Sequence, residues 1–207
     1  SGASSVVSGG YLNAASGSES GVVSGRQNQA TAQRSFIGGG FTNVNSSTGG
    51  TISGGQYNTA STNSHATVVG GSGNTSSGQY SVSGGINSTA SSGNSIAIGY
   101  VSTASGNKSV AIGGEGNNAS AAGSVAIGGE LNRANSNFSF AIGRYSQTHL
   151  ESQFATSAGR FAANGDAQAS QLVARKFDDL TTGGTTVLSL DGTGTTGLII
   201  PNGTNRV

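Results

Sequence analysis

Two carboxylates in this chain have a spacing that could support chemistry. Glu115 and Glu130 stand fifteen residues apart, at the same position in two nearly identical stretches of sequence. If each stretch forms one turn of a stacked coil, the two side chains lie about 4.8 Å apart along its axis. Retaining glycosidases hold two carboxyl groups about 5 Å apart in a sugar-binding groove. Because we expect both glutamates in exposed turns without a cleft, a solvated pair is favoured over catalysis.

A second set of residues has the character of a binding surface. Aromatic side chains stand just after the glycine that closes each copy of the repeat, among charged residues such as Arg26 and Arg144. Exposed rings of this kind stack on sugar rings and are common in binding surfaces. The alternative is that they pack between neighbouring chains, and this is favoured because so thin a coil needs the apolar area. The candidate receptor or glycan contacts are Tyr11, Phe41, Tyr57, Tyr100 and Tyr145.

No metal or cofactor site is predicted. His65 and His149 lie far apart, and neither belongs to a pattern of His, Cys or Asp at metal-ligand spacing. Repeated calcium binding needs a carboxylate in each turn, whereas the repeats carry Asn or Ser there and no Asp precedes Asp166. Residues 192–197 have the glycine spacing of a dinucleotide-binding loop. A strand-like segment ending in Pro201 follows where that loop needs a helix, so we expect a plain Gly/Thr turn.

The low charge of the chain excludes several classes of partner. Only 8% of the residues are charged and the formal net charge is +1, whereas proteins that bind nucleic acid carry a basic stripe. No apolar run approaches the length of about 18 residues that a membrane-spanning helix needs. Cysteine is absent. The sequence thus predicts no nucleic-acid partner, no membrane insertion in this segment and no disulfide scaffold.

The elements that position these residues come from a short repeat. Its clearest copies are Ser109–Ala119 and Ser124–Ala134, which both begin Ser-Val-Ala-Ile-Gly-Gly-Glu. An Asn or Ser follows each closing glycine by three residues, and a small residue usually stands two further on. Steps of 14 to 16 residues separate the closing glycines, which are Gly10, Gly25, Gly40, Gly55, Gly71, Gly85, Gly99, Gly114, Gly129 and Gly143.

A period near fifteen fits two short strands and two tight turns. Large and small apolar residues alternate in segments such as Val125-Ala126-Ile127, which places Val and Ile on one face of a strand. Gly and Asn tolerate the positive φ that tight turns require. The predicted fold is all-β, a parallel β-roll or short β-solenoid of about ten turns with stacked asparagines. The turn residues of the clearest repeats are Gly99, Gly114, Gly129, Gly143, Asn117 and Asn132.

The repeat sets the predicted domain boundaries. Residues 1–148 form the β-roll, 149–166 a neck or connector, and 167–207 a β-rich C-terminal region with strands at 172–177, 185–190 and 198–200. We expect that last region to be truncated, because the chain stops at Val207 within an apparent element. Each turn of the roll offers only one to three sizeable apolar side chains, and small cores are marginally stable. We therefore expect self-association into a closed ring of identical chains.

The Ser-Val-Ala-Ile-Gly copies, with the Asn or Ser and Ala that follow them, resemble the head repeats of trimeric autotransporter adhesins of the YadA type. The resemblance covers residues 1–148 and is strongest over 95–143. It implies a left-handed parallel β-roll, three chains side by side in a homotrimer, exposure on a bacterial surface, and binding to matrix or host molecules. It specifies the architecture and leaves the ligand open.

The C-terminal part resembles a different group of proteins. Residues 165–175, 188–192 and 198–204 look like a segment common in tail-fibre proteins of tailed bacteriophages. This tips the expected function towards a non-enzymatic tail fibre of a virion that recognises a glycan or protein on the host cell surface. The alternative is a bacterial trimeric adhesin head on the outer surface of its cell. A second alternative is a tail spike that cleaves polysaccharide.

Overall fold

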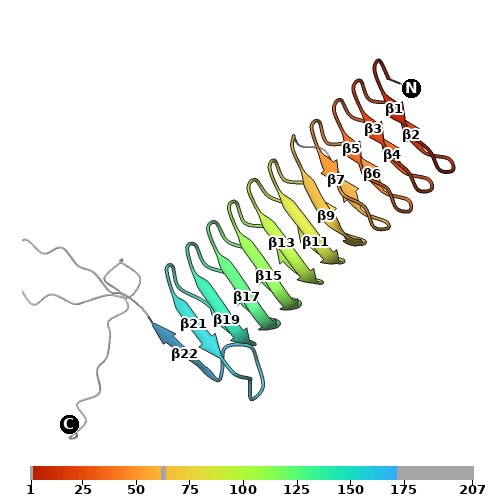
Figure 1. The fold of residues 1–207 in the computed structure, drawn as a ribbon. Helices are drawn as coiled ribbons and strands as arrows, with labels where there is room; N and C mark the ends of the chain where they lie inside the picture. Colours follow the sequence, from red (N-terminus) through yellow and green to blue (C-terminus); the bar gives the residue numbers. More distant parts are fainter. Residues whose placement is uncertain (1, 62–63, 172–207) are drawn as a thin grey trace, which may run out of the picture.

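The computed structural model describes residues 2–61 and 64–171, and these form a rod of stacked turns without a helix (Figure 1). Each turn contributes one strand to each of two parallel sheets, which we call sheet A and sheet B. The three strands expected after residue 171 lie outside the described residues. The prediction of an all-β parallel solenoid of about ten turns is confirmed for the part of the chain that the structure describes.

Sheet A has twelve strands, which follow one another along the rod in the order β1-β3-β5-β7-β9-β11-β13-β15-β17-β19-β21-β22. The first four are two residues long, and those from β9 to β19 have five or six. Their bounds are β1 Val6–Val7, β3 Gly21–Val22, β5 Phe36–Ile37, β7 Thr51–Ile52, β9 Thr67–Ser72, β11 Val82–Ile86, β13 Ile96–Tyr100, β15 Val110–Glu115, β17 Val125–Glu130, β19 Phe140–Arg144, β21 Phe154–Ser157 and β22 Gln168–Gln171.

Sheet B has ten strands of two residues each, stacked in the order β2-β4-β6-β8-β10-β12-β14-β16-β18-β20. Two short strands in each turn, as the fifteen-residue period predicted, are thus present, and those of sheet B are very short. Their bounds are β2 Ala14–Ala15, β4 Gln29–Ala30, β6 Val44–Asn45, β8 Thr59–Ala60, β10 Thr75–Ser76, β12 Thr89–Ala90, β14 Thr103–Ala104, β16 Asn118–Ala119, β18 Arg133–Ala134 and β20 Gln147–Thr148.

Equivalent residues of successive repeats stack directly on one another. Val110, Ala111 and Ile112 of β15 pair with Val125, Ala126 and Ile127 of β17. Because side chains alternate between the two faces of a strand, this register puts Ala111 and Ala126 on one face and their large neighbours on the other. The alternation seen in the sequence is therefore the alternation between the inside and the outside of the rod.

The inside of the rod is lined by small residues in its later turns. Ala97, Ala111, Ala126 and Ala141 of sheet A are fully buried and face the buried alanines of sheet B, so the two sheets lie close together. In the earlier turns the inward position of sheet A carries larger side chains, and these are also fully buried or nearly so: Val22, Ile37, Ile52 and Val68.

The large residues of the later turns lie on the outer face of sheet A. There they form two columns along the rod and remain partly exposed, because none of the described residues lies outside them. We call this set the outer apolar face. Its members are Val82, Ile96, Ile98, Val110, Ile112, Val125, Ile127, Phe140 and Ile142.

Sheet A extends into the segment expected as a connector. Strand β21 continues the parallel stack, and Phe154 lies against Phe140 with ring centroids 5.3 Å apart. The chain then reverses through residues 158–167, and β22 pairs with β21 in the antiparallel direction (Figure 1). Phe161, at the loop between them, is 89% exposed. The change of direction ends the parallel stack at β21.

Candidate binding surface

The predicted contact residues lie along one edge of the rod, where each turn passes from sheet A to sheet B. The chain turns here because the position after the closing glycine continues the parallel register, whereas the next position has a positive φ, for example 56° at Tyr57 and 64° at Tyr145. Two adjacent columns result. The first comprises Tyr11, Arg26, Phe41, Gln56, Ser72, Ile86, Tyr100, Glu115, Glu130 and Arg144.

The second column is joined to the first by backbone hydrogen bonds. The N–H of Tyr57, for instance, donates to the carbonyl of Phe41 one turn back, and the N–H of Tyr145 donates to that of Glu130. The five predicted aromatic residues therefore occupy two columns: Tyr11, Phe41 and Tyr100 lie in the first, and Tyr57 and Tyr145 in the second. The structure brings three of them together and separates the other two.

The three that come together are Tyr11, Phe41 and Tyr57, in the first four turns. The guanidinium of Arg26 lies between two of these rings, 5.6 Å from the centroid of Tyr11 and 5.6 Å from that of Phe41. Phe41 meets the ring of Tyr57 edge-on at 5.3 Å. Tyr11 is 60% exposed and Tyr57 is 54% exposed. We call Tyr11, Arg26, Phe41 and Tyr57 the aromatic column.

Tyr145 belongs to a separate cluster at the other end of the rod. Its hydroxyl donates to Glu130 Oε1 over 2.9 Å, and Arg144 Nε donates to Glu130 Oε2 over 2.8 Å. Both Arg144 and Arg160 lie over the tyrosine ring, with guanidinium carbons 4.9 and 4.2 Å from its centroid. Tyr100 stands alone between these clusters, half-exposed, with Ile86 and Glu115 as its neighbours in register.

The stacked glutamates differ in their surroundings. Glu115 and Glu130 pair in register, as the fifteen-residue spacing predicted. Both carboxylate oxygens of Glu130 accept a hydrogen bond, one from Tyr145 and the other from Arg144. These two bonds, that of Tyr145 most strongly, hold the pKa of Glu130 below its ordinary value. Both oxygens of this carboxylate are thus engaged by an ion pair and a hydrogen bond from the next turn.

The histidines have different settings. His65 lies on the opposite edge of the rod, where its ring stacks on Tyr80 with centroids 5.0 Å apart and planes 15° apart. The pairing of Tyr80 with His65 was not foreseen, although the fifteen-residue step between them is the signal that reveals it. The backbone N–H of His149 donates to the side chain of Gln153. In residues 2–61 and 64–171 no three potential metal ligands come together.

Beneath the aromatic column runs a buried ladder of asparagines. The side-chain oxygens of the first four accept the backbone N–H of the next asparagine over 3.0–3.1 Å. Each amide nitrogen donates to the closing glycine of the next turn and to a carbonyl of its own turn, which belongs to Ser24 for Asn28 and to a glycine for the others. This ladder fixes the turn that presents the rings. Its members in the first five turns are Asn13, Asn28, Asn43, Asn58 and Asn74.

The closing glycines lie against the same ladder. A Cβ added at Gly129 would come 1.6 Å from the carbonyl oxygen of Gly143, and Gly129 has a φ of 50°. Successive turns approach so closely here that no side chain fits between them. Asn117 and Asn132 continue the ladder in these later turns, with the N–H of Asn132 donating to Asn117 Oδ1 over 3.1 Å.

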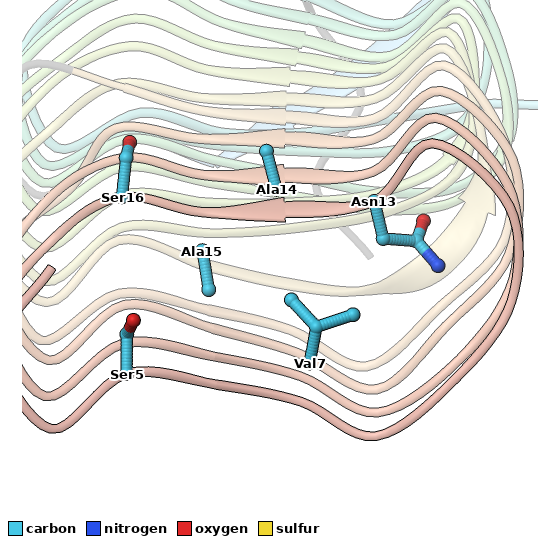
Figure 2. Close-up of a pocket in the computed structure, with 6 residues that line it drawn as sticks. All are labelled: Ser5, Val7, Asn13, Ala14, Ala15 and Ser16. Carbon is cyan, nitrogen blue, oxygen red and sulfur yellow. The ribbon is translucent and has the colours of Figure 1, made fainter. Parts of the chain in front are cut away.

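A hollow opens at the N-terminal end of the rod (Figure 2). It is the mouth of the coil: Val7 points into it and is 44% exposed, whereas the equivalent Val22 one turn further in is 1% exposed. The remaining lining includes two serine hydroxyls but no ionisable side chain, so no lining residue can act as a general base towards them. Those residues are Ser5, Asn13, Ala14, Ala15 and Ser16.

The described residues thus form a repeat protein of the β-solenoid class, with a polar core ladder and an apolar outer face. In a comparison with family models, the sequence matches the YadA head domain repeat in two copies, over residues 76–102 and 90–115. This supports the adhesin-head part of the resemblance and suggests an adhesin-like fibre exposed at a surface. A comparison with curated proteins found no match. Neither comparison supports the tail-fibre segment, most of which lies outside the described residues.

No helix in the described ranges is long and apolar enough to cross a membrane.

Proposed function

We propose that this chain is the rod of a homotrimeric adhesive fibre that binds a cell-surface glycan or protein without catalysis. The coil would be left-handed, as in the heads it resembles, and three rods would pack side by side. The observation that carries the proposal is the outer apolar face. Its branched and aromatic residues point away from a core that small residues already fill.

The outer apolar face needs a partner surface because it is continuous. Ile98, Ile112 and Ile127 follow one another in register, and Val110 and Val125 form the neighbouring column beside them. Contiguous exposed apolar patches on soluble proteins mark interaction sites. The outer face of sheet B is different in kind, since polar Thr59, Thr75, Thr89 and Thr103 stack there in register. A rod with one apolar and one polar outer face suits a closed ring, in which the apolar faces pack around a common axis and the polar faces meet solvent.

The match to the YadA head domain repeat favours a bacterial adhesin head on the outer surface of its cell. A bacteriophage tail fibre is the second candidate, and what favours it is the sequence of residues 165–175 and 188–204. Antibodies to this chain distinguish the two, because they would label either intact bacterial cells or purified virions.

The trimer is tested by measuring molar mass by light scattering over a range of concentrations. A mass of three times 20.1 kDa that survives dilution is expected. Replacing Ile112 and Ile127 together by Thr keeps β-branched residues in the strands but removes apolar contact area, and should release monomers. The matched control Thr103→Ser lies on the outer face of sheet B and should leave the mass unchanged. A folded monomer for the unmodified chain would refute the homotrimer.

Adhesion and catalysis are tested together. Beads coated with the purified protein should bind the target cells, and incubation with the cell-surface polysaccharide should release no reducing ends. Release of oligosaccharide that Glu130→Gln abolishes would instead establish the polysaccharide-cleaving spike. Failure of the beads to bind any cell tested would contradict the adhesive function.

A further inference from the structure

We propose that the aromatic column is a binding site for acidic sugars, in which Arg26 pairs with a sugar carboxylate while Tyr11, Phe41 and Tyr57 stack on sugar rings. This inference deepens the proposed adhesive function, on which it rests, by naming the chemical class of the ligand and the end of the rod that takes it.

The first step is the geometry of Arg26. Its guanidinium lies 5.6 Å from the centroids of the rings above and below it, so the two rings hold it at the surface along the rod. Attraction between a cation and the face of an aromatic ring stabilises such a stack, more strongly where water is excluded. A guanidinium held in place loses less conformational freedom when it binds a ligand, so the column presents a preorganised cation.

The second step is that no acidic side chain of the described residues neutralises the charge of Arg26. Among residues 2–61 and 64–171 the one ion pair is that of Arg144 with Glu130, and the guanidinium of Arg26 donates no side-chain hydrogen bond. Residues 1–99 contain a single acidic residue, Glu19, which lies in a turn at the opposite edge of the rod together with Arg34. The planar fork of donors is thus available for a carboxylate, which it fits in a bidentate manner.

The third step is the spacing of the rings. One turn of the rod advances about 4.8 Å, which is comparable to the length of one sugar ring in a linear chain. Tyr11 and Phe41 lie two turns apart, about 9.6 Å, with Arg26 between them, and Tyr57 lies one turn beyond Phe41 in the second column. The exposed parts of these rings therefore offer separate contacts to the sugars of a glycan lying along the rod. Aromatic faces contribute apolar contact, and the Tyr hydroxyls add polar ends that water or sugar hydroxyls can reach. A sugar that bears a carboxylate can pair with Arg26 through that group and contact the aromatic rings through its own ring.

The cluster at the other end of the rod provides an internal comparison. Arg144 also lies over a tyrosine ring, but its guanidinium already pairs with Glu130. An acidic sugar approaching there would meet a carboxylate that is already in place. Arg160 also lies over that ring and donates to Asn164 Oδ1, so the comparison concerns the guanidinium of Arg144 alone. Its ion pair with Glu130 occupies the donors that Arg26 keeps available.

The experiment measures binding of the full chain to oligogalacturonate by titration calorimetry, with maltohexaose as the neutral sugar of similar length. We expect the acidic oligosaccharide to bind and maltohexaose to bind at least about tenfold more weakly. Arg26→Gln should weaken oligogalacturonate binding about tenfold or more, as expected for loss of a charge-assisted pair. Tyr57→Ala should weaken both sugars by a similar factor, because stacking does not depend on the carboxylate.

The matched control is Arg34→Gln. It removes the same charge from an exposed arginine on the opposite edge of the same part of the rod. The affinity for oligogalacturonate should change less than about twofold, because only the long-range attraction of the acidic sugar, which salt screens, is reduced. Equal losses for Arg26→Gln and Arg34→Gln would overturn the site, because only general charge would then matter. Equal binding of both sugars, or no binding of either, would also overturn it.

The competing arrangement, in which these rings pack between chains, gives a different result. If Arg26→Gln or Tyr57→Ala converts the assembly to monomers by light scattering, the column is a subunit contact and the proposed site is refuted. If the assembly persists and sugar binding is lost, the site stands. Should the sugar site fail while coated beads still bind cells, the adhesive function survives with a different ligand.

Discussion

The side-chain amide of Gln168 makes both hydrogen bonds that a neighbouring strand would make with Gln147. Its oxygen accepts the backbone N–H of Gln147 over 2.8 Å, and its nitrogen donates to the Gln147 carbonyl over 2.7 Å. Gln147 lies in β20, the last strand of sheet B. An exposed strand edge invites pairing with other chains, and covering it prevents this. Gln168 thus covers the last strand of sheet B, while β22 is the last strand of sheet A that the structure describes.

Replacing Gln168 by Ala should open this end of sheet B. Two hydrogen bonds worth about 1 kcal/mol each are lost, so the amide of Gln147 should exchange with solvent at least about tenfold faster by hydrogen-exchange NMR. Gln168→Glu should restore only part of the protection, since a carboxylate can accept the N–H but cannot donate to the carbonyl. The control Gln29→Ala, on the outer face of β4, should leave exchange at Gln147 unchanged. Unchanged exchange in Gln168→Ala would show that the amide does not seal the edge.

The stability of the rod should depend on the side-chain amides of the asparagine ladder. Asn43 is fully buried; its amide nitrogen donates to Gly39 and Gly55 carbonyls over 3.0 and 2.9 Å, and its oxygen accepts the N–H of Asn58. Asn43→Ala should lower the free energy of unfolding by about 2–4 kcal/mol, because buried backbone groups lose their partners. Denaturant unfolding monitored by circular dichroism measures this loss.

Asn43→Asp should be worse at neutral pH, because it turns a donor into an oxygen that faces two carbonyls and buries a charge. Burial raises the folded-state pKa of such a carboxyl, so the variant is most stable below the unfolded pKa and loses stability as the pH rises. The denaturant concentration at the midpoint of its unfolding should therefore decrease as the pH is raised from 4 to 7. A midpoint independent of pH would mean that this position is solvated.

The asparagine ladder is interrupted in the sixth and seventh turns, where Ser88 and Ser102 replace asparagine. A substitution should restore it. Asn74 Oδ1 accepts the N–H of Ser88, but the Ser88 hydroxyl bonds only to the Gly99 carbonyl, and the hydroxyl of Ser102 in the next turn is buried without a partner. Ser88→Asn should add the missing amide and raise the unfolding free energy by about 1–2 kcal/mol, measured by thermal and denaturant unfolding. Thr89→Asn, on the outer face of the same turn, should give no such gain. A lower stability for Ser88→Asn would show that the turn is too tightly packed for the larger side chain.

The loop that precedes β22 should open at low pH. Asp166 accepts the backbone N–H groups of Ala163, Ala162 and Phe161 over 2.6–2.9 Å, and these bonds lower its pKa. Hydrogen bonds from Tyr145 and Arg144 likewise lower the pKa of Glu130. A depressed folded-state pKa contributes stability above the unfolded value, and this stability is lost as the pH falls through the folded value.

We therefore expect the amide signals of Ala162 and Ala163 to shift and broaden in NMR spectra as the pH falls below about 4, the ordinary range of a carboxyl group. Asp166→Asn should remove this dependence on pH in residues 161–163, whereas Glu19→Gln should preserve it. Amide signals that stay constant down to pH 2 in the unmodified chain would contradict the role of Asp166 in holding the loop.

The sequence by itself determined the period, the number of turns and the stacking of equivalent residues. The reason is physical: in a coil with a turn of about fifteen residues, Val110 pairs in register with its counterparts one turn away, Ile96 and Val125. Asn117 and Asn132 meet in the same way. The alternation of Ala126 with Val125 and Ile127 likewise follows from the two faces of a strand. The closing glycines marked the turns because their φ is positive and the next turn leaves no room for a side chain. The asparagines marked the turns through their ladder of hydrogen bonds and not through positive φ, which falls instead on residues such as Leu12 and Val101.

Tertiary structure alone decided which face is the inside and where the rings gather. Alternation does not say whether Ile127 or Ala126 points inward; the close approach of the two sheets leaves room for alanine and sends isoleucine outside. Tyr57 and Tyr145 stand two residues after their closing glycines and therefore lie in a second column, where Tyr57 meets Phe41 while Tyr100 stands alone. Arg144 forms an ion pair with Glu130 of the preceding turn, whereas Arg26 has no such partner among the described residues. This difference depends on which residues lie next to each other in successive turns and not on a local pattern of residues.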